Sequence, residues 1–339
     1  MSTLRLGING LGRIGRGLLR ASLERDDLEV VAINDLSDPE DLAYLLRYDS
    51  VHGRLPALVE HSDHALIVNG REISVTATRN PGEISWADRG AHTVIESTGL
   101  FTKREHAAQH LEGGAERVLI SGPSKDADGI FVPWVNTDAF DPAVHQVVSM
   151  ASCTTNCIAP ICEILHRHFG IENLLVTTVH AYTSTQSIQD RPAKKKTRGR
   201  AAAVNIVPTS TGAAKATALV IPELAGKLDG MALRVPIPDG SIADMVVRLE
   251  VDTNVDRIHE ILREEAAGRY EGVLAVSEDP LVSSDIVGDP HSSIVDGPST
   301  MALGARTFKI LSWYDNEMGY SNRLLDFATF MHAQASEAS

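Results

Sequence analysis

The stretch LRLGINGLGRIGRGLLRASLERDDLEVVAIND, residues 4–35, carries the signal that decides the fold of this chain. It opens with an apolar run typical of a strand, continues with GLGRIG (10–15), which has the pattern G-x-G-x-x-G, and then shows helical spacing. A second apolar run, 28–34, ends in Asp35, about 20 residues beyond Gly15. This order of strand, glycine turn, helix, strand and acid predicts a dinucleotide-binding unit rather than a glycine turn without a ligand.

Each glycine of GLGRIG has an expected task. Gly10 permits the tight turn, Gly12 lets the backbone approach a pyrophosphate, and Gly15 lets the helix pack on the strand. The N-terminus of the helix then presents unpaired N–H groups and a partial positive charge to the phosphates. The carboxylate of Asp35 is expected to accept hydrogen bonds from the adenosine ribose.

Composition excludes several classes of partner. The chain has 339 residues, is 43% hydrophobic and 22% charged, and carries a formal net charge of −14. An acidic chain repels nucleic acid and anionic membranes, and no apolar signal or membrane-spanning run is apparent. Three clustered cysteines do not form a disulfide framework or a recognisable zinc motif. We expect a cytoplasmic protein with no metal site, no nucleic-acid partner and no membrane contact.

The remaining pattern predicts two domains of an α/β protein. In the first half, a hairpin at 64–78 and short buried strands alternate with helices, which predicts a parallel, Rossmann-type sheet. The second half has longer strand signals and longer connections, which indicate an α+β catalytic domain with a mixed or antiparallel sheet. We place the dinucleotide-binding domain at 1–152, completed by a C-terminal helix at 317–339, and the catalytic domain at 153–316.

Two further residues are chemical candidates. Cys153, in ASCTTNCIAPIC (151–162), stands where a small polar run meets a helical pattern, and a helix N-terminus lowers a thiol pKa. Taken alone, this stretch fits a reactive thiol and a buried apolar cysteine equally well. His180 ends an apolar strand and is either a partner for a nucleophile or a core histidine. The basic run RPAKKKTRGR (191–200) is either a solvated loop or a contact for phosphorylated ligands.

Together these segments resemble the phosphorylating glyceraldehyde-3-phosphate dehydrogenase family. The resemblance covers nearly the whole chain and rests on the following stretches in order: INGLGRIGR (8–16), LLRYDSVHG (45–53), STG (97–99), ASCTTNCIAP (151–160), TVHAYT (178–183), PTSTGAAKA (208–216), LRVP (233–236) and SWYDNEMGYSNR (312–323). SCTTN combined with the later YDNE and GYSNR is the most specific part.

The resemblance implies an oxidation of glyceraldehyde 3-phosphate to 1,3-bisphosphoglycerate, with inorganic phosphate as co-substrate and NAD as cofactor. Cys153 would be the nucleophile and His180 its base. The implied phosphate-binding residues are Ser152, Thr154, Thr211 and Gly212 for the attacking phosphate, and Thr183, Thr185 and Arg234 for the substrate phosphate. The implied cofactor-binding residues are Gly10, Gly12, Arg13, Ile14, Gly15, Asp35, Arg79, Thr98, Ser121, Asn316 and Tyr320. The family also suggests a homotetramer.

Some positions depart from the family pattern, and some alternatives stay open. Met150 replaces a usual Asn, Pro133-Trp134 replaces a small or glycine-containing pair, and Arg191 replaces a usual Leu. Asp35 favours NAD because it repels a 2′-phosphate, whereas Arg191 could offset that repulsion and allow NADP. The rival functions are erythrose-4-phosphate dehydrogenase, aspartate-semialdehyde or N-acetylglutamyl-phosphate reductase chemistry, and non-catalytic nucleotide binding.

Overall fold

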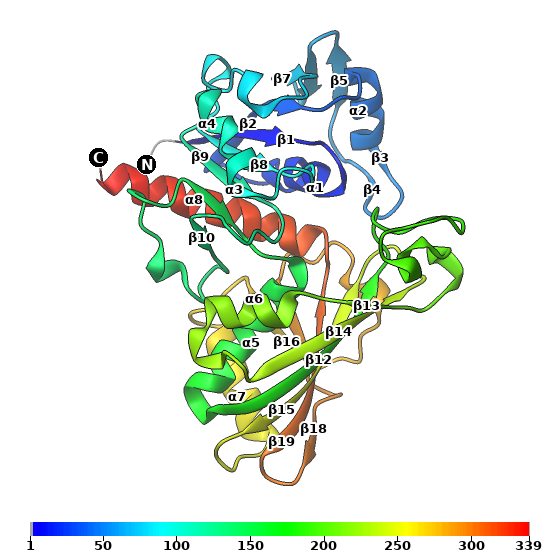
Figure 1. The fold of residues 1–339 in the computed structure, drawn as a ribbon, viewed down its shortest axis with the longest axis vertical. Helices are drawn as coiled ribbons and strands as arrows, with labels where there is room; N and C mark the ends of the chain where they lie inside the picture. Colours follow the sequence, from blue (N-terminus) through cyan, green and yellow to red (C-terminus); the bar gives the residue numbers. More distant parts are fainter. Residues whose placement is uncertain (1–2, 339) are drawn as a thin grey trace. The chain divides into compact units, whose positions relative to one another are not determined.

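Two units, each built around its own sheet, make up the chain (Figure 1). The computed structural model describes residues 3–338. The first unit comprises the chain up to Pro133, Thr137–Ala151 and the C-terminal segment from Ser321. The second comprises Trp134–Asn136 and Ser152–Tyr320.

The sheet of the first unit has the strand order β10-β11-β9-β8-β1-β2-β7-β6-β5. It is parallel from β10 to β7 and antiparallel at the β6–β5 edge. Its strands are β1 (Leu4–Asn9), β2 (Leu28–Asn34), β5 (Val59–Ser62), β6 (Ala65–Val68), β7 (Arg71–Thr76), β8 (Thr93–Glu96), β9 (Arg117–Ile120), β10 (Gly129–Ile130) and β11 (Val147–Ser149). The central strands are almost wholly buried, as parallel strands covered on both faces must be.

Helices and a hairpin complete this unit. The helices are α1 (Arg13–Ser22), α2 (Pro39–Arg47), α3 (Arg104–Ala107), α4 (Gln109–Glu112) and the part of α8 (Met318–Ala338) from Ser321 onward. A small β3–β4 pair joins Tyr48–Asp49 to Gly53–Arg54. Asn69 and Gly70 both have positive φ, 50° and 79°, in the turn between β6 and β7, so the predicted hairpin is confirmed. Phe327 of α8 stacks on Phe131 at a ring distance of 5.2 Å, which anchors the C-terminal helix in this unit.

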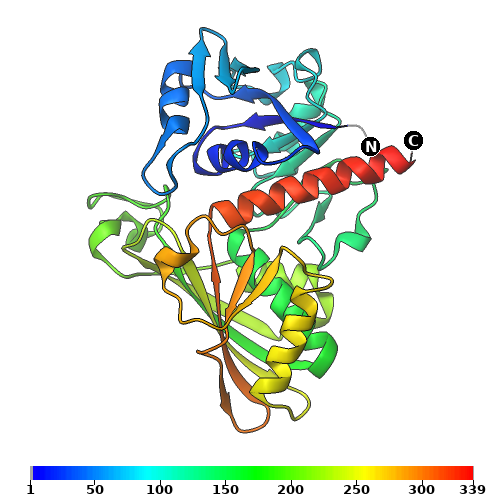
Figure 2. The same ribbon diagram turned by 180° about the vertical axis from the view of Figure 1, so that it is seen from behind.

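The second unit contains a mixed sheet, as predicted, with the order β13-β14-β12-β15-β19-β17-β16 and β18 beside β19. Its strands are β12 (Ile171–Ala181), β13 (Val207–Ser210), β14 (Leu228–Val235), β15 (Ser241–Leu249), β16 (Leu274–Ser277), β17 (Ser293–Asp296), β18 (Met301–Leu303) and β19 (Thr307–Tyr314). Its helices are α5 (Cys153–Phe169), α6 (Ala213–Val220) and α7 (Val255–Ala266). Figures 1 and 2 show α5 and α7 on one side of this sheet.

The departure at Pro133-Trp134 has a structural consequence. Trp134 adopts φ 64°, a left-handed conformation that costs a residue with a side chain about 1 kcal/mol and costs glycine nothing. Its carbonyl oxygen accepts a hydrogen bond from Arg269 Nε at 2.9 Å, which holds the turn in this conformation.

Among residues 3–338, none of the helices combines the length and apolarity needed to span a bilayer.

Candidate active site

Cys153 and His180, 27 positions apart, meet in the second unit. Cys153 is the first residue of α5, and Ser152 caps that helix by accepting the N–H of Thr155 at 3.1 Å. His180 lies near the end of β12, and its Nε2 is 3.5 Å from the sulfur of Cys153. The thiol therefore stands at a helix N-terminus, where a partial positive charge favours a thiolate, and faces an imidazole.

Arg234 faces His180 because the strands β12 and β14 run parallel with these two residues in register. The Nδ1 of His180 lies 2.7 Å from the carbonyl oxygen of Ala181. A carbonyl oxygen only accepts, so this contact favours an imidazole proton on Nδ1, whereas a guanidinium only donates and favours an Nδ1 without a proton. Arg234 Nη1 donates to the same carbonyl oxygen at 2.8 Å and lies 2.6 Å from Nδ1.

Burial and the nearby guanidinium control the protonation of this pair. Burial, reinforced by the positive charge of Arg234, lowers the pKa of His180 to about 3, so the imidazole is neutral at physiological pH. Burial raises the pKa of the Cys153 thiol, while the charge of Arg234 and hydrogen bonds from Thr154 lower it. The resting pair is therefore a thiol beside a neutral imidazole, and Arg234 is the cation that favours ionisation of the sulfur.

This electrostatic arrangement predicts a pH effect of Arg234. Removing a cation that lowers a thiol pKa must raise that pKa, so less thiolate is present at any given pH. In Arg234→Leu, the midpoint of Cys153 alkylation by the neutral reagent iodoacetamide is expected about one pH unit higher than in the unmodified chain. Arg234→Lys, which keeps the charge, is the matched control and should move the midpoint less. An unchanged or lower midpoint in Arg234→Leu would contradict this assignment.

Tyr314 is a member of the site that sequence reasoning missed, although it lies within the quoted motif SWYDNEMGYSNR. Its ring meets the ring of His180 edge-on at 5.9 Å and 78°. Its hydroxyl shares hydrogen bonds with the hydroxyls of Thr154 at 2.9 Å and Thr178 at 2.7 Å. Tyr314 thus links the first turn of α5 to β12 and fixes the distance between the thiol and the imidazole.

Asn316 is tied to the same strand through Ser241. The hydroxyl of Ser241 donates to Asn316 Oδ1 at 2.5 Å and accepts the N–H of Ala181 at 3.1 Å. Asp315 shapes the turn around Asn316 by accepting backbone N–H groups from Glu317 and Met318, each at 2.7 Å. Because Ser241 engages its carbonyl oxygen, Asn316 offers a ligand its amide N–H₂ group as a donor.

The predicted phosphate-binding residues fall into separate groups. Thr183 lies two residues beyond the end of β12, and its hydroxyl lies 2.8 Å from that of Thr185. Thr211 and Gly212 lie at the N-terminus of α6, where Thr211 Oγ1 accepts the N–H of Ala213 at 3.2 Å. In the described part of the chain, neither Thr211 nor Gly212 hydrogen-bonds to Cys153.

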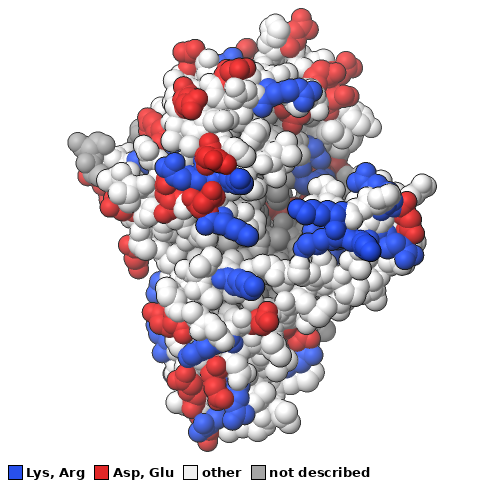
Figure 3. Space-filling view, in the orientation of Figure 1, with Lys and Arg blue, Asp and Glu red and all other residues white. Residues whose placement is uncertain are grey.

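The basic run 191–200 lies against the strand that leads to Thr211. Figure 3 shows the cationic side chains gathered over this loop. Arg198 Nε donates to Thr209 Oγ1 at 3.0 Å, and Lys195 Nζ donates to Ser210 Oγ at 2.6 Å. The charge of Arg198 also lowers the pKa of both His180 and Arg234, so it acts on the same site. The loop therefore places positive charge beside the active site.

In the first unit, a cleft of about 340 Å³ opens at the carboxyl ends of β1, β2 and β8. Five predicted cofactor-binding residues line it, namely Gly10, Gly12, Asp35, Arg79 and Thr98. The sequence did not single out the other lining residues, namely Asn9, Asn34, Leu36, Thr78, Ser97, Leu100 and Phe101. Most of these residues lie at or just after the carboxyl end of a strand. Because ligands of parallel α/β sheets bind at these strand ends, their position in the sequence could have indicated them.

The glycine turn has the shape that a pyrophosphate requires. A Cβ added at Gly12 would have no heavy atom within 4 Å, so the space in front of this residue is open to a ligand. A Cβ at Gly15 would stand 2.1 Å from the carbonyl oxygen of Gly10, so only glycine permits this close packing. Asp35 is fixed at the end of β2 because it accepts the N–H groups of Leu11 at 2.7 Å and Ser37 at 3.0 Å. These residues fit a dinucleotide.

Other predicted cofactor residues lie outside the lining of this cleft. The side chain of Arg13 pairs with Asp49 at 2.6 Å, so this guanidinium stabilises the loop after α2, while Ile14 lies in the first turn of α1. The N–H of Ser121 donates to the carbonyl oxygen of Glu96 at 2.9 Å, next to the end of β8. Tyr320, in the second unit, is buried, and burial together with the negative charge of Cys153 raises its pKa.

Comparison with known proteins identifies the family. The profile described as glyceraldehyde 3-phosphate dehydrogenase, NAD binding domain, matches residues 4–104, and the profile of the C-terminal domain matches residues 152–316. The chain is 53% identical over 328 residues to glyceraldehyde-3-phosphate dehydrogenase of Geobacillus stearothermophilus, covering 97% of this chain and 98% of that protein. The enzyme of the same name from Thermotoga maritima is 52% identical over 324 residues, or 95% and 97% of the two chains. The chain belongs to the glyceraldehyde-3-phosphate dehydrogenase family.

Proposed function

We propose that this chain oxidises glyceraldehyde 3-phosphate to 1,3-bisphosphoglycerate in the presence of NAD and inorganic phosphate. The observation that carries the proposal is the 3.5 Å contact between Cys153 Sγ and His180 Nε2 at the N-terminus of α5. A thiol in this setting can attack an aldehyde carbon, and the neutral imidazole can take up the proton that the thiol loses. The chain is therefore an NAD-dependent oxidoreductase that uses covalent catalysis.

The residues of the site account for each covalent step. The sulfur of Cys153 bonds to the aldehyde carbon, and the proton taken up by His180 passes to the aldehyde oxygen, which gives a thiohemiacetal and a neutral imidazole again. The α5 N-terminus stabilises the negative charge that develops on this oxygen. When bound, NAD accepts the hydride that leaves this carbon. Nε2 of His180 takes the hydroxyl proton as the carbonyl re-forms, which leaves a thioester on Cys153. A phosphate oxygen then attacks the acyl carbon, the carbon–sulfur bond breaks, and the departing thiolate takes back the proton from His180, which restores the thiol and the neutral imidazole.

Two anion sites are part of the proposal. Arg234 and Thr183, with Thr185 beside it, would bind the phosphate of the substrate, because both flank the end of β12 that carries His180. Ser152, Thr154, Thr211 and Gly212 would bind the attacking phosphate through hydroxyls and the N-termini of α5 and α6. Arg198 and Lys195 add positive charge beside this second site.

The cofactor site is assigned to the cleft of the first unit. Gly10, Gly12, Gly15 and the first turn of α1, with Arg13 and Ile14, would hold the pyrophosphate, and Asp35 would bind the adenosine ribose. Arg79, Thr98 and Ser121 lie in or beside this cleft. Asn316 and Tyr320 are the residues proposed to contact the nicotinamide.

Cofactor choice follows from the fixed carboxylate of Asp35. A 2′-phosphate next to this carboxylate brings like charges together, so kcat/KM for NAD is expected to exceed that for NADP by at least about 30-fold. Asp35→Asn should narrow this ratio. The Nε of Arg191 donates to Ser187 Oγ at 2.9 Å. Arg191→Leu removes this cation, which offsets the repulsion of a 2′-phosphate, and should therefore widen the ratio of kcat/KM for NAD to kcat/KM for NADP. A clear preference for NADP in the unmodified chain would contradict the assignment.

Domain limits, assembly and location complete the proposal. We place the dinucleotide-binding domain at 1–152 with the C-terminal helix 317–339, and the catalytic domain at 153–316. A cytoplasmic homotetramer is the assembly that the family suggests.

Steady-state kinetics test the proposed activity. NADH formation should require glyceraldehyde 3-phosphate and inorganic phosphate together, and erythrose 4-phosphate should give a lower kcat/KM. Faster turnover of erythrose 4-phosphate would favour the sister enzyme, and no NADH formation with either aldehyde would favour a non-catalytic nucleotide-binding protein.

A further inference from the structure

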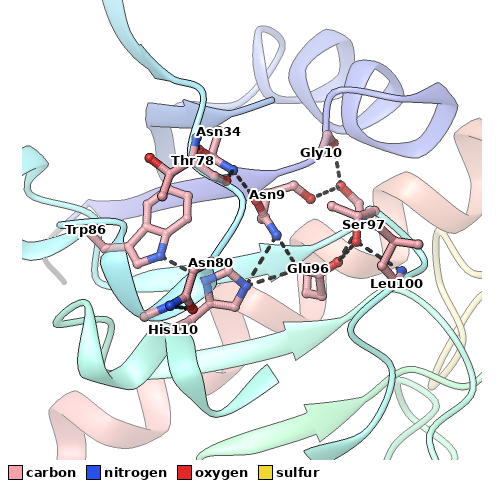
Figure 4. Close-up of polar contacts among 12 residues, drawn as sticks. Asn9, Gly10, Asn34, Thr78, Asn80, Trp86, Glu96, Ser97, Leu100 and His110 are labelled. Carbon is pink, nitrogen blue, oxygen red and sulfur yellow. Dashed lines mark hydrogen bonds and ion pairs between the residues drawn. The ribbon is translucent and has the colours of Figure 1, made fainter. Parts of the chain in front are cut away.

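A network of buried polar side chains lies beneath the cleft of the first unit (Figure 4). Its centre is Glu96, the last residue of β8, which is 2% exposed. Oε2 of Glu96 accepts Asn9 Nδ2 at 2.5 Å and lies 3.0 Å from His110 Nε2. Oε1 accepts the backbone N–H of Thr98 at 2.9 Å and its hydroxyl at 2.5 Å. A group that accepts four donors on two oxygens is an ionised carboxylate.

The contacts with Trp86 and Glu96, which are shorter than the 3.5 Å between Asn9 Nδ2 and His110 Nε2, leave His110 one protonation pattern. This side chain, in α4, is fully buried, and its Nδ1 lies 3.0 Å from Nε1 of Trp86. An indole N–H is a donor only, so Nδ1 of His110 must be the acceptor and the ring proton must be on Nε2. His110 is therefore a neutral imidazole that donates Nε2–H to Glu96. Trp86 fixes this tautomer.

The network continues to the ends of the neighbouring strands. Asn34 Nδ2, at the end of β2, donates to Asn9 Oδ1 at 2.8 Å and to the carbonyl oxygen of Thr78 at 2.9 Å. The N–H of Thr78 donates back to Asn34 Oδ1 at 2.8 Å. Four members of the network, Asn9, Asn34, Thr78 and Thr98, line the cleft, whereas Glu96, His110 and Trp86 do not. The buried members can therefore act on a ligand only through the lining members.

The network also sets the position of the glycine turn. Gly10 has φ 91°, and a Cβ there would come within 2.8 Å of Thr98 Cγ2 and 2.9 Å of Thr98 N. The turn thus packs directly on the backbone of Thr98, whose N–H is held by Glu96. Ser97 Oγ adds a hydrogen bond to the carbonyl oxygen of Gly10 at 2.7 Å. A shift of the Glu96 carboxylate would displace the turn that meets the pyrophosphate.

We propose that Glu96, oriented by His110, is a positioning residue for dinucleotide binding: its carboxylate holds the ends of β1 and β8 and the Gly10 turn in the arrangement that receives the cofactor. This inference rests on the proposed function only in assigning the cleft to NAD. Its effect on cofactor binding can be measured apart from the covalent chemistry, because the network belongs to the first unit whereas the Cys153–His180 pair belongs to the second.

Glu96→Gln tests the proposal with almost no change in side-chain shape. One oxygen becomes an N–H₂ group, which must point either at the N–H of Thr98 or at the N–H groups of Asn9 and His110. The proton of His110 cannot move from Nε2 to Nδ1, because the indole N–H of Trp86 donates to Nδ1. Both orientations place donors against donors, so the network must shift. We expect the dissociation constant of NAD, measured by calorimetric titration, to rise at least about tenfold.

The readouts separate a positioning role from a merely structural one. KM for NAD should rise with the dissociation constant, while kcat at saturating NAD and the rate of Cys153 alkylation by iodoacetamide stay within about threefold. Val94→Ala is the matched control, since Val94 is a fully buried apolar residue of the same strand. It should lower the melting temperature by creating a cavity and leave the affinity for NAD unchanged.

His110→Gln provides a second test at a residue that does not line the cleft. Like Glu96→Gln, it should raise the dissociation constant of NAD, here by at least about threefold, and leave kcat unchanged. The proposal is overturned if Glu96→Gln and His110→Gln lower the melting temperature as Val94→Ala does and leave the NAD dissociation constant unchanged. Failure of the proposed function is a different result, because the unmodified chain would then bind NAD without oxidising glyceraldehyde 3-phosphate.

Discussion

Cys153→Ser is expected to lower kcat for glyceraldehyde 3-phosphate oxidation by at least about 10⁴-fold. A serine hydroxyl holds its proton far more strongly than a thiol, so far less of the nucleophilic anion forms at position 153. The helix N-terminus and Arg234, which favour a thiolate, cannot compensate for this difference. The measurement is NADH formation at saturating substrate, phosphate and NAD.

Cys157→Ser is the matched control for this variant. Cys157 lies one helical turn further along α5, is fully buried, and has a pKa raised to about 12 by burial. Its sulfur contacts the hydroxyl of Ser312 at 3.5 Å, so a serine finds a polar partner there. Turnover in Cys157→Ser should stay within about threefold of the unmodified chain. Near-normal turnover in Cys153→Ser would refute the nucleophile assignment.

His180→Gln is expected to lower kcat by about 10²–10⁴-fold. The glutamine amide can fill part of the space and donate a hydrogen bond, but it cannot take a proton from the sulfur or from the thiohemiacetal hydroxyl. Two steps, formation of the adduct and departure of the hydride, therefore lose their base. The affinity for NAD should change little, since the cleft of the first unit contains neither His180 nor its partners.

His259→Gln controls for loss of a buried histidine. His259 is 9% exposed, lies in α7, and has a pKa lowered by burial, yet it makes no contact with Cys153. It should retain normal turnover. If His180→Gln kept more than about a tenth of the unmodified kcat, proton transfer by His180 would not be part of the mechanism.

The glycine turn could be predicted from sequence because its determinants are local. GLGRIG and Asp35 belong to one strand–helix–strand segment, so residue spacing alone indicates their proximity. The hairpin at Asn69-Gly70 was predictable for the same reason, since the two residues of the turn decide it. The resemblance to a family then supplied what spacing could not, namely a partner for Cys153.

The rest of the site depends on long-range register. Arg234 faces His180 because β12 pairs in parallel with β14. No local sequence pattern specifies this pairing. Tyr314 reaches Thr154 and Thr178 from a strand more than a hundred residues away. The hydrogen bond between Glu96 and His110 joins the end of a strand to a four-residue helix that has no strong periodic signal. Such contacts are fixed by packing, so they emerge only in the folded chain.

The most direct test of the account is a single-turnover experiment without phosphate. Mixing the enzyme with NAD and excess glyceraldehyde 3-phosphate should release about one equivalent of NADH per chain and leave an acyl group on Cys153, located by mass spectrometry of the peptides. Added inorganic phosphate should then discharge this thioester as an acyl phosphate and restore turnover. An acyl group on another residue, or a full rate of turnover without any acylated Cys153, would contradict the account.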